Sequence, residues 1–261
     1  IVPNGVKKVG DYAFTGCNQL ESITFSDDVI MVGKYAFQNC HKLTSVKIGS
    51  GVSSMSETAF EGCANLDEFV VIDNKGAYST QDGILYNRSK TKVVRCPLNK
   101  RGIINLPASI GTIGDYAFSS CTGITSIYIT ETGTIGSCAF SNCTNLESIH
   151  IADRWNTVTF IMDYAFENCT GLESITFNGD KKLIETASGI KMYSVYIRTS
   201  AFENCTKLKN VQLKNVEYIE DRVFRNCKSL EKLILPEGLE YIGSECIAGT
   251  GISKIEIPSS V

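Results

Sequence analysis

Apolar residues recur in one pattern from end to end of this chain. A segment that starts with Ala-Phe, places Cys three residues after the Phe and ends in alternating apolar residues occupies residues 13–23 and again 36–46. Further copies begin at Ala59, Ala117, Ala139, Ala165, Ala201 and Val223, with a degenerate copy at Cys246. The Phe residues of most neighbouring copies lie 22 or 23 residues apart, so the chain is an array of about nine short repeat units.

Each repeat unit predicts one short strand and one turn. The Leu-x-x-Ile-x-Ile end, for example residues 20–25 or 146–151, is apolar at alternate positions and favours a strand. The Ala-Phe segment follows a Gly and is compatible with one α-helical or 3₁₀ turn on the opposite wall. A unit of this length cannot bury its apolar residues alone, so stacking of units predicts a solenoid with a parallel sheet along one face.

The complete pattern, V-x-x-I-G-x-x-A-F-x-x-C-x-x-L-x-x-I-x-I, resembles a leucine-rich repeat. Its A-F-x-x-C variant resembles the BspA-like (treponemal-type) class of bacterial and protist surface proteins. The resemblance implies one leucine-rich-repeat solenoid over residues 1–261, of α/β type. It would be a right-handed superhelix with a concave parallel sheet and short helical or 3₁₀ turns opposite. It also implies an adhesin-like role at the extracellular cell surface.

Extra residues enter the repeat in three places, at about 72–105, 152–161 and 178–198, each time after the predicted strand. The first resembles a hairpin insertion that recurs in the BspA-like class, with strands at 84–86 and 92–95. Insertions at equivalent positions should emerge on one edge of a solenoid. Because Trp155, Tyr193 and Tyr196 lie in the second and third insertions, this edge is a candidate ligand site. The alternative is that these aromatic residues only pack the loops down.

The outward positions of the predicted strands form the second candidate site. The middle position is most often Ser, and the next outward position carries Tyr128, His150 and Thr176 in three successive units. An aromatic residue flanked by polar groups is typical of a recognition surface, so these three residues are candidate ligand contacts. The alternative is a solvated Ser/Thr ladder without a ligand.

Composition adds 11 Cys and only 2 His. Eight Cys share one position of the unit: Cys17, Cys40, Cys63, Cys121, Cys143, Cys169, Cys205 and Cys227. Stacked units repeat at about 4.8 Å, which is wider than the Cβ separation of a disulfide, so we expect a reduced, inward-facing ladder of thiols. The oxidation state of the off-pattern Cys96, Cys138 and Cys246 stays open. Zinc is disfavoured because the thiols are about 22 residues apart and no C-x-x-C motif occurs.

Other chemistry has little support in the sequence. The net charge of −3 disfavours a nucleic-acid partner, and no apolar run is long enough to span a membrane. We predict no catalytic residues, because neither His lies in a recognisable nucleophile motif, and no metal or cofactor. Asn-x-Ser/Thr sequons at Asn142, Asn168 and Asn204 arise from the repeat itself and are interpreted as turn residues rather than glycosylation sites.

Three functions therefore remain open. The first is a protein- or glycan-binding module on a cell surface, with the ligand on the concave face or the loop edge. The second is a structural spacer that holds another domain away from the surface. The third is an intracellular interaction scaffold, favoured by the predicted reduced thiols. The chain begins and ends within a repeat unit, and neither end resembles a polar cap, so we expect a segment of a longer protein that shows no signal peptide.

Overall fold

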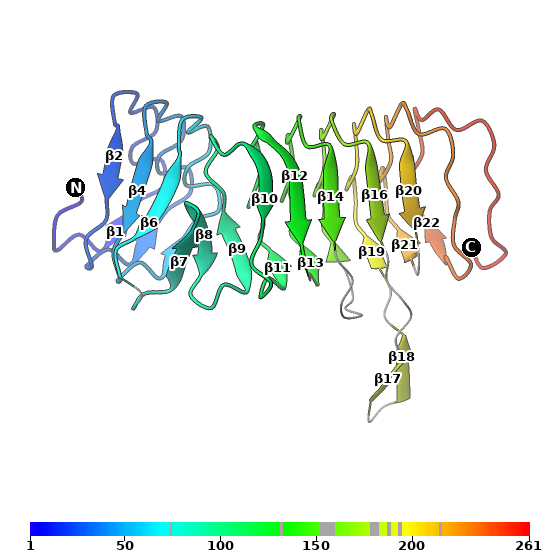
Figure 1. The fold of residues 1–261 in the computed structure, drawn as a ribbon, viewed down its shortest axis with the longest axis horizontal. Coiled ribbons are helices and arrows are strands. Elements are labelled where there is room, and N and C mark those ends of the chain that lie inside the picture. Colours follow the sequence, from blue (N-terminus) through cyan, green and yellow to red (C-terminus); the bar gives the residue numbers. More distant parts are fainter. Residues whose placement is uncertain are drawn as a thin grey trace.

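The computed structural model describes residues 1–73, 75–130, 133–151, 160–177, 183–186, 189–192, 195–213 and 216–261. For residues 176–177, 183–186 and 189–192 it describes the backbone alone. The chain forms a parallel β-solenoid of about nine turns (Figure 1). The fold class predicted from the repeat is confirmed in this coarser form.

The first sheet contains the predicted Leu-x-x-Ile-x-Ile strands. Its members are β2 (Ser22–Thr24), β4 (Ser45–Ile48) and β6 (Glu68–Val71), and then β10 (Gly102–Asn105), β12 (Ile124–Ile129), β14 (Ser148–Ile151), β16 (Ser174–Phe177) and β20 (Asn210–Leu213). Within each of its two parts, β2 to β6 and β10 to β20, neighbouring strands pair in parallel and keep the repeat phase, so that Ile23 pairs with Val46 and Ile127 with Ile149. These apolar residues point into the core, and the residues between them face outwards.

A second sheet, which the sequence analysis did not predict, runs along another wall of the solenoid. One part contains β1 (Lys8–Val9), β3 (Met31–Val32) and β5 (Ser54–Met55). The longer part contains β7 (Tyr78–Gln81), β8 (Ile84–Asn87), β9 (Lys92–Arg95), β11 (Thr112–Ile113), β13 (Thr134–Ile135), β15 (Phe160–Ile161), β19 (Val195–Ile197), β21 (Val216–Ile219) and β22 (Tyr241–Ile242). Most of these strands come from the V-x-x-I-G half of the unit and have only two to four residues, too few for a visible alternation.

The prediction of helical or 3₁₀ turns is wrong. The Ala-Phe segments form irregular turns, and no helix occurs in the described part of the chain. The reason is backbone conformation, because a typical unit places two residues in the left-handed region, such as Tyr35 at φ 55° and Asn39 at φ 57°. A right-handed helix requires negative φ throughout. The turns are joined instead by bonds between units, such as Phe37 N–H to the carbonyl of Ala59 at 2.8 Å.

Inside the solenoid, equivalent residues of successive turns stack on one another in columns. The Phe rings lie face to face at centroid distances of about 5 Å, for example 5.0 Å from Phe118 to Phe140 and 5.1 Å from Phe140 to Phe166. The repeat Cys side chains lie beside them, buried in every turn but the first, and all 11 Cys are free thiols. Each of six ladder thiols donates to a Phe carbonyl of the preceding turn at 3.0–3.1 Å, which explains why Cys suits this position: Cys40, Cys63, Cys143, Cys169, Cys205 and Cys227.

A ladder of Asn side chains follows the outer side of these turns. The Nδ2 of Asn168 donates to Oδ1 of Asn142, Asn204 to Asn168, and Asn226 to Asn204, each at 2.9–3.0 Å. All four residues have positive φ, a conformation that Asn tolerates better than most residues. At Asn168 and Asn204 the sequon nitrogen is already a ladder donor, which agrees with a structural rather than a glycosylated role.

Two of the three insertions form hairpins in the described part of the chain. In the first, β8 and β9 pair antiparallel as predicted from residues 84–95, and β7 adds a third strand. This insertion separates two core clusters, because Leu85 packs with the first three turns while Ile84 and Tyr86 pack with the later turns. In the third insertion, β17 (Leu183–Thr186) and β18 (Gly189–Met192) form an antiparallel hairpin that lies beyond the edge of the sheets in Figure 1.

Candidate functional site

Tyr128 and His150 form a stacked pair on the outer face of the first sheet. They are register partners on β12 and β14, and their neighbours Ile127 and Ile149 point into the core. The two rings lie 4.3 Å apart at 14°, and Tyr128 is 43% exposed. The adjacency expected from the repeat phase is therefore present, and it places a solvent-facing aromatic pair beside Ser residues on the outer face of the sheet.

Serine hydroxyls lie next to this pair. The Oγ atoms of Ser126 and Ser148 are 3.0 Å apart, and Ser148 Oγ is 3.1 Å from Nε2 of His150. The hydroxyl can donate to the imidazole or accept from it, according to the tautomer. The rings and the Ser hydroxyls together present both apolar edges and hydrogen-bonding groups to a ligand.

The remaining candidate residue of this face continues the row of outward positions along the sheet. Ser148 pairs with Ser174, and Thr176 pairs with Gln212, so the backbone of Thr176 follows His150 in the same outward row. The side chain of Thr176 is outside the description. Asn105 precedes Tyr128 in the row.

Tyr196 lies away from this pair. It is on β19 of the second sheet, where its ring stacks on Phe160 at 5.3 Å and on Tyr218 at 5.6 Å. The other two candidates of the loop edge, Trp155 and Tyr193, lie outside the described residues. The structure thus brings Tyr128 and His150 together and places Tyr196 in a separate aromatic row.

This aromatic row on the second sheet was not recognised in the sequence. A hollow of about 520 Å³ is lined by Tyr196, Tyr218 and Tyr241, with Arg198 beside them in an ion pair to Glu220 at 3.0 Å. The phenol of Tyr218 donates to Glu240 at 2.7 Å, and this bond raises the pKa of Tyr218. The sequence does contain a signal for this row: in four units an aromatic residue stands directly before the Ile of the second-sheet strand. It was missed because that segment was not assigned to a strand.

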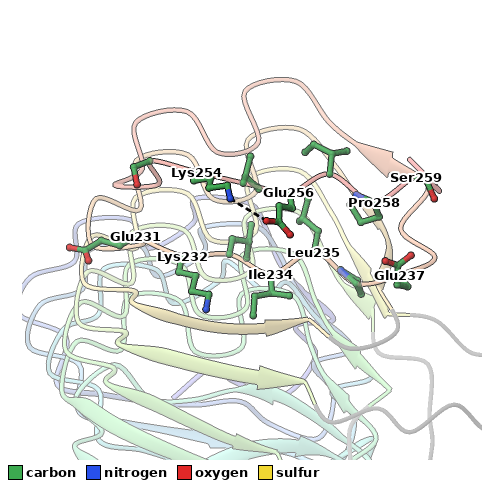
Figure 2. A pocket seen from close by; sticks show the side chains of 14 residues that line it. Glu231, Lys232, Ile234, Leu235, Glu237, Lys254, Glu256, Pro258 and Ser259 are labelled. Carbon is green, nitrogen blue, oxygen red and sulfur yellow. Dashed lines mark ion pairs between the residues drawn. The ribbon is translucent and has the colours of Figure 1, made fainter.

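A larger hollow lies at the end of the first sheet (Figure 2). It has a volume of about 940 Å³ between residues 231–237 and 253–259, with Ile234, Lys254 and Glu256 among its lining residues. Lys254 and Glu256 form an exposed ion pair at 3.4 Å. The lining is aliphatic with charges of both signs, and it holds no His or Cys that would suggest catalysis.

The described part of the chain contains no group of three or more His, Cys, Asp or Glu residues placed to hold a metal ion. Nor does it contain a helix of the length and apolarity needed to cross a membrane. His150 lies beside Ser148, but no described carboxylate orients the imidazole as nucleophilic catalysis requires.

Comparison with known proteins extends these observations. A family model for the BspA type leucine-rich repeat region matches residues 1–103, 94–193 and 156–261, with six copies. Among curated proteins, no sequence matches significantly.

Solved structures share the fold. A leucine-rich repeat protein from Eubacterium ventriosum aligns with a TM-score of 0.58 and 18% identity over 99% of this chain and 84% of that chain. A leucine-rich cell surface protein from Faecalibacterium prausnitzii gives 0.63 and 22% over 87% and 69%, and the pneumococcal vaccine antigen PcpA gives 0.62 and 17% over 96% and 59%. At these identities the similarity concerns the fold. Because the family model matches throughout the chain, this protein belongs to the BspA type leucine-rich repeat family.

Proposed function

We propose that this protein is a non-enzymatic binding module of a cell-surface, adhesin-like protein, and that its ligand contacts the first sheet around Tyr128 and His150. The observation that carries the proposal is the exposed ring stack above paired Ser hydroxyls. Aromatic side chains contribute much of the binding energy of protein interfaces, because they bury a large area with few rotatable bonds.

The geometry of the stack favours a protein ligand over a glycan. At 4.3 Å and 14°, each ring covers one face of the other, so the shared faces are closed to a sugar ring. Ring edges and the Ser hydroxyls remain exposed, and these suit the side chains and backbone groups of a polypeptide. Leucine-rich repeat proteins generally bind protein ligands.

Display at the surface is supported by the fold neighbours. One is described as a cell surface protein and another as a vaccine antigen. With a net charge of −3, a nucleic acid is a poor partner for this chain, because phosphate contacts need a basic excess.

The direct experiment uses the full chain on immobilised extracellular-matrix proteins, host-cell surfaces and a glycan array. We expect binding to a protein component that is lost in the Tyr128→Ala/His150→Ala double variant. Binding to glycans alone would show that the ligand is a sugar and not a protein. A complete absence of binding, together with failure of antibodies against the chain to label intact cells, would contradict the proposal and favour the spacer.

A further inference from the structure

Two buried thiols in the core cluster of the later turns, directly after the first inserted hairpin, depart from the ladder. Cys96 follows β9, and its N–H bonds to the carbonyl of Ala117 at 2.7 Å, as Phe118 N–H bonds to Ala139 in the next turn. Cys96 therefore occupies the place that Phe takes in the other turns. Both Cys96 and Cys121 are completely buried, and the Cys96 thiol donates a hydrogen bond to the sulfur of Cys121.

Cys121 is also displaced relative to the ladder thiols. Its sulfur lies 3.9 Å from the carbonyl oxygen of Cys96, whereas six equivalent thiols lie 3.0–3.1 Å from the corresponding Phe oxygen. The sulfur atoms of Cys121 and Cys96 instead converge on one acceptor, the carbonyl oxygen of Pro97, at 3.7 and 3.6 Å. No other pair of described ladder thiols shares an acceptor in this way.

A buried cation lies next to this pair. Arg95 is 4% exposed, and its guanidinium donates to the carbonyls of Tyr116 and Ser119. Its Nε has no hydrogen-bond partner and no carboxylate pairs with it among the described residues. The bond from Cys96 and the nearby charge of Arg95 lower the pKa of the Cys121 thiol, whereas burial raises the pKa of Cys96, so Cys121 is the thiol of the pair that ionises first.

We propose that Cys96 and Cys121 are an oxidisable pair that forms a disulfide, joining the first inserted hairpin to the turn that follows it. With oxidised glutathione as oxidant during folding, before the core closes around the pair, the Cys121 thiolate attacks one sulfur and releases a glutathione thiolate. Cys96, having lost its proton to water, then attacks the Cys121 sulfur of the mixed disulfide and releases the second. Two electrons pass from the protein thiols to glutathione, and two protons leave the protein and are taken up by the released thiolates. This bond would close the loop of residues 96–121 within the core cluster of the later turns, independently of any ligand.

The experiment refolds the full chain from urea in buffers of reduced and oxidised glutathione, then alkylates the free thiols under denaturing conditions. Trypsin releases Cys96 on residues 96–100, and chymotrypsin releases Cys121 on residues 119–128. We expect these peptides to be linked in oxidising buffer, so that two of the 11 thiols escape alkylation. Cys143 and Cys169, each bonded to its own Phe carbonyl, are the matched control and should stay alkylated.

The Cys121→Ser variant provides a second control. It should leave Cys96 alkylated at every redox ratio, without a new link to Cys143, while circular dichroism reports the same fold as the wild type. Full alkylation of Cys96 and Cys121 in the refolded wild type would overturn the proposal. Linkage that is no more frequent than between Cys143 and Cys169 would also overturn it.

Discussion

At the scale of single residues, the Asn side chains show how one position serves both backbone and packing. Asn204 has φ 62°, donates to Asn168 and accepts from Asn226. The same turn position carries Gly in other units, as at Gly16 and Gly62, also with positive φ. Gly and Asn tolerate the left-handed region better than most residues, and Asn adds inter-unit hydrogen bonds that a Gly lacks.

Asn204→Ala is expected to lower the free energy of unfolding by about 2–5 kcal/mol. It loses two hydrogen bonds, at about 0.5–1.5 kcal/mol each, and forces Ala into the left-handed region, at about 1–2 kcal/mol. Urea denaturation measures the change. Asn204→Gly is the matched control and should be less destabilising by about 1 kcal/mol, because it keeps the backbone conformation. An Ala variant as stable as the Gly variant would contradict this explanation.

The ladder thiols give a prediction of pH dependence. Burial raises the pKa of Cys63 and Cys227 to about 12, from an ordinary value near 9. Because the folded-state pKa is raised, the stability that these thiols contribute is complete below pH 9 and is lost as the pH rises towards 12. Each thiol should cost up to about 1.4 kcal/mol per pH unit in that window.

The corresponding measurement is the urea midpoint at pH 7, 9 and 10 for the wild type and for Cys63→Ala. The variant should lose stability less steeply with pH, since other titrating groups are common to both proteins. Parallel curves for the two proteins would show that burial of the Cys63 thiol does not govern the alkaline loss.

At the scale of elements, the repeat predicts the first-sheet strand of each unit, in which apolar and polar residues alternate. It does not predict the second-sheet strand, which lacks this alternation. In β14, Ile149 and Ile151 alternate with Ser148 and His150, which is enough to indicate a strand. The two-residue β15 and β22 carry no such signal, and their pairing depends on neighbouring turns. The turns defeated a helical prediction because Tyr and Asn, rather than Gly alone, adopt positive φ there.

The positions of the candidate site residues could be predicted only where their strands could be predicted. The phase of the repeat was enough to place Tyr128 beside His150, because register partners in stacked units follow the repeat length. Tyr196 was assigned to a loop edge, and its stacking with Phe160 and Tyr218 could not be predicted without the second sheet.

The Phe stack should be the main energetic element of each turn. Phe140→Ala is expected to lower the free energy of unfolding by about 3–5 kcal/mol, because the side chain is completely buried between Phe118 and Phe166. The comparison is Tyr128→Ala, which removes an exposed ring and should cost about 1 kcal/mol or less. Similar losses for the two variants in urea denaturation would contradict the assignment of the core.

At the scale of the whole molecule, the first insertion divides the solenoid into two core clusters. Leu85 packs in the cluster of the first three turns, and Ile127 packs in the other. Between β6 and β10 the first sheet is not continuous, so the clusters are coupled mainly through the inserted strands β7 to β9. Such a junction favours opening of one cluster without the other.

Hydrogen exchange should detect this division. Leu85→Ala is expected to accelerate amide exchange by about 30-fold or more in β2, β4 and β6, with little effect on β14, β16 and β20. Ile127→Ala, a truncation of comparable size in the second cluster, should do the reverse. Acceleration throughout the chain in both variants would mean that the solenoid opens as one unit.

The central claim is that the outer face of the first sheet binds the ligand. Its most direct test compares two double variants on the protein ligand identified by the binding screen. Tyr128→Ala/His150→Ala removes the stacked pair, and Phe160→Ala/Tyr218→Ala removes rings from the second sheet. We predict that the first variant weakens affinity about 30-fold or more, as expected for a binding hot spot, and that the second leaves it unchanged. Unchanged affinity in the first variant and a loss in the second would contradict the account and move the binding surface to the second sheet.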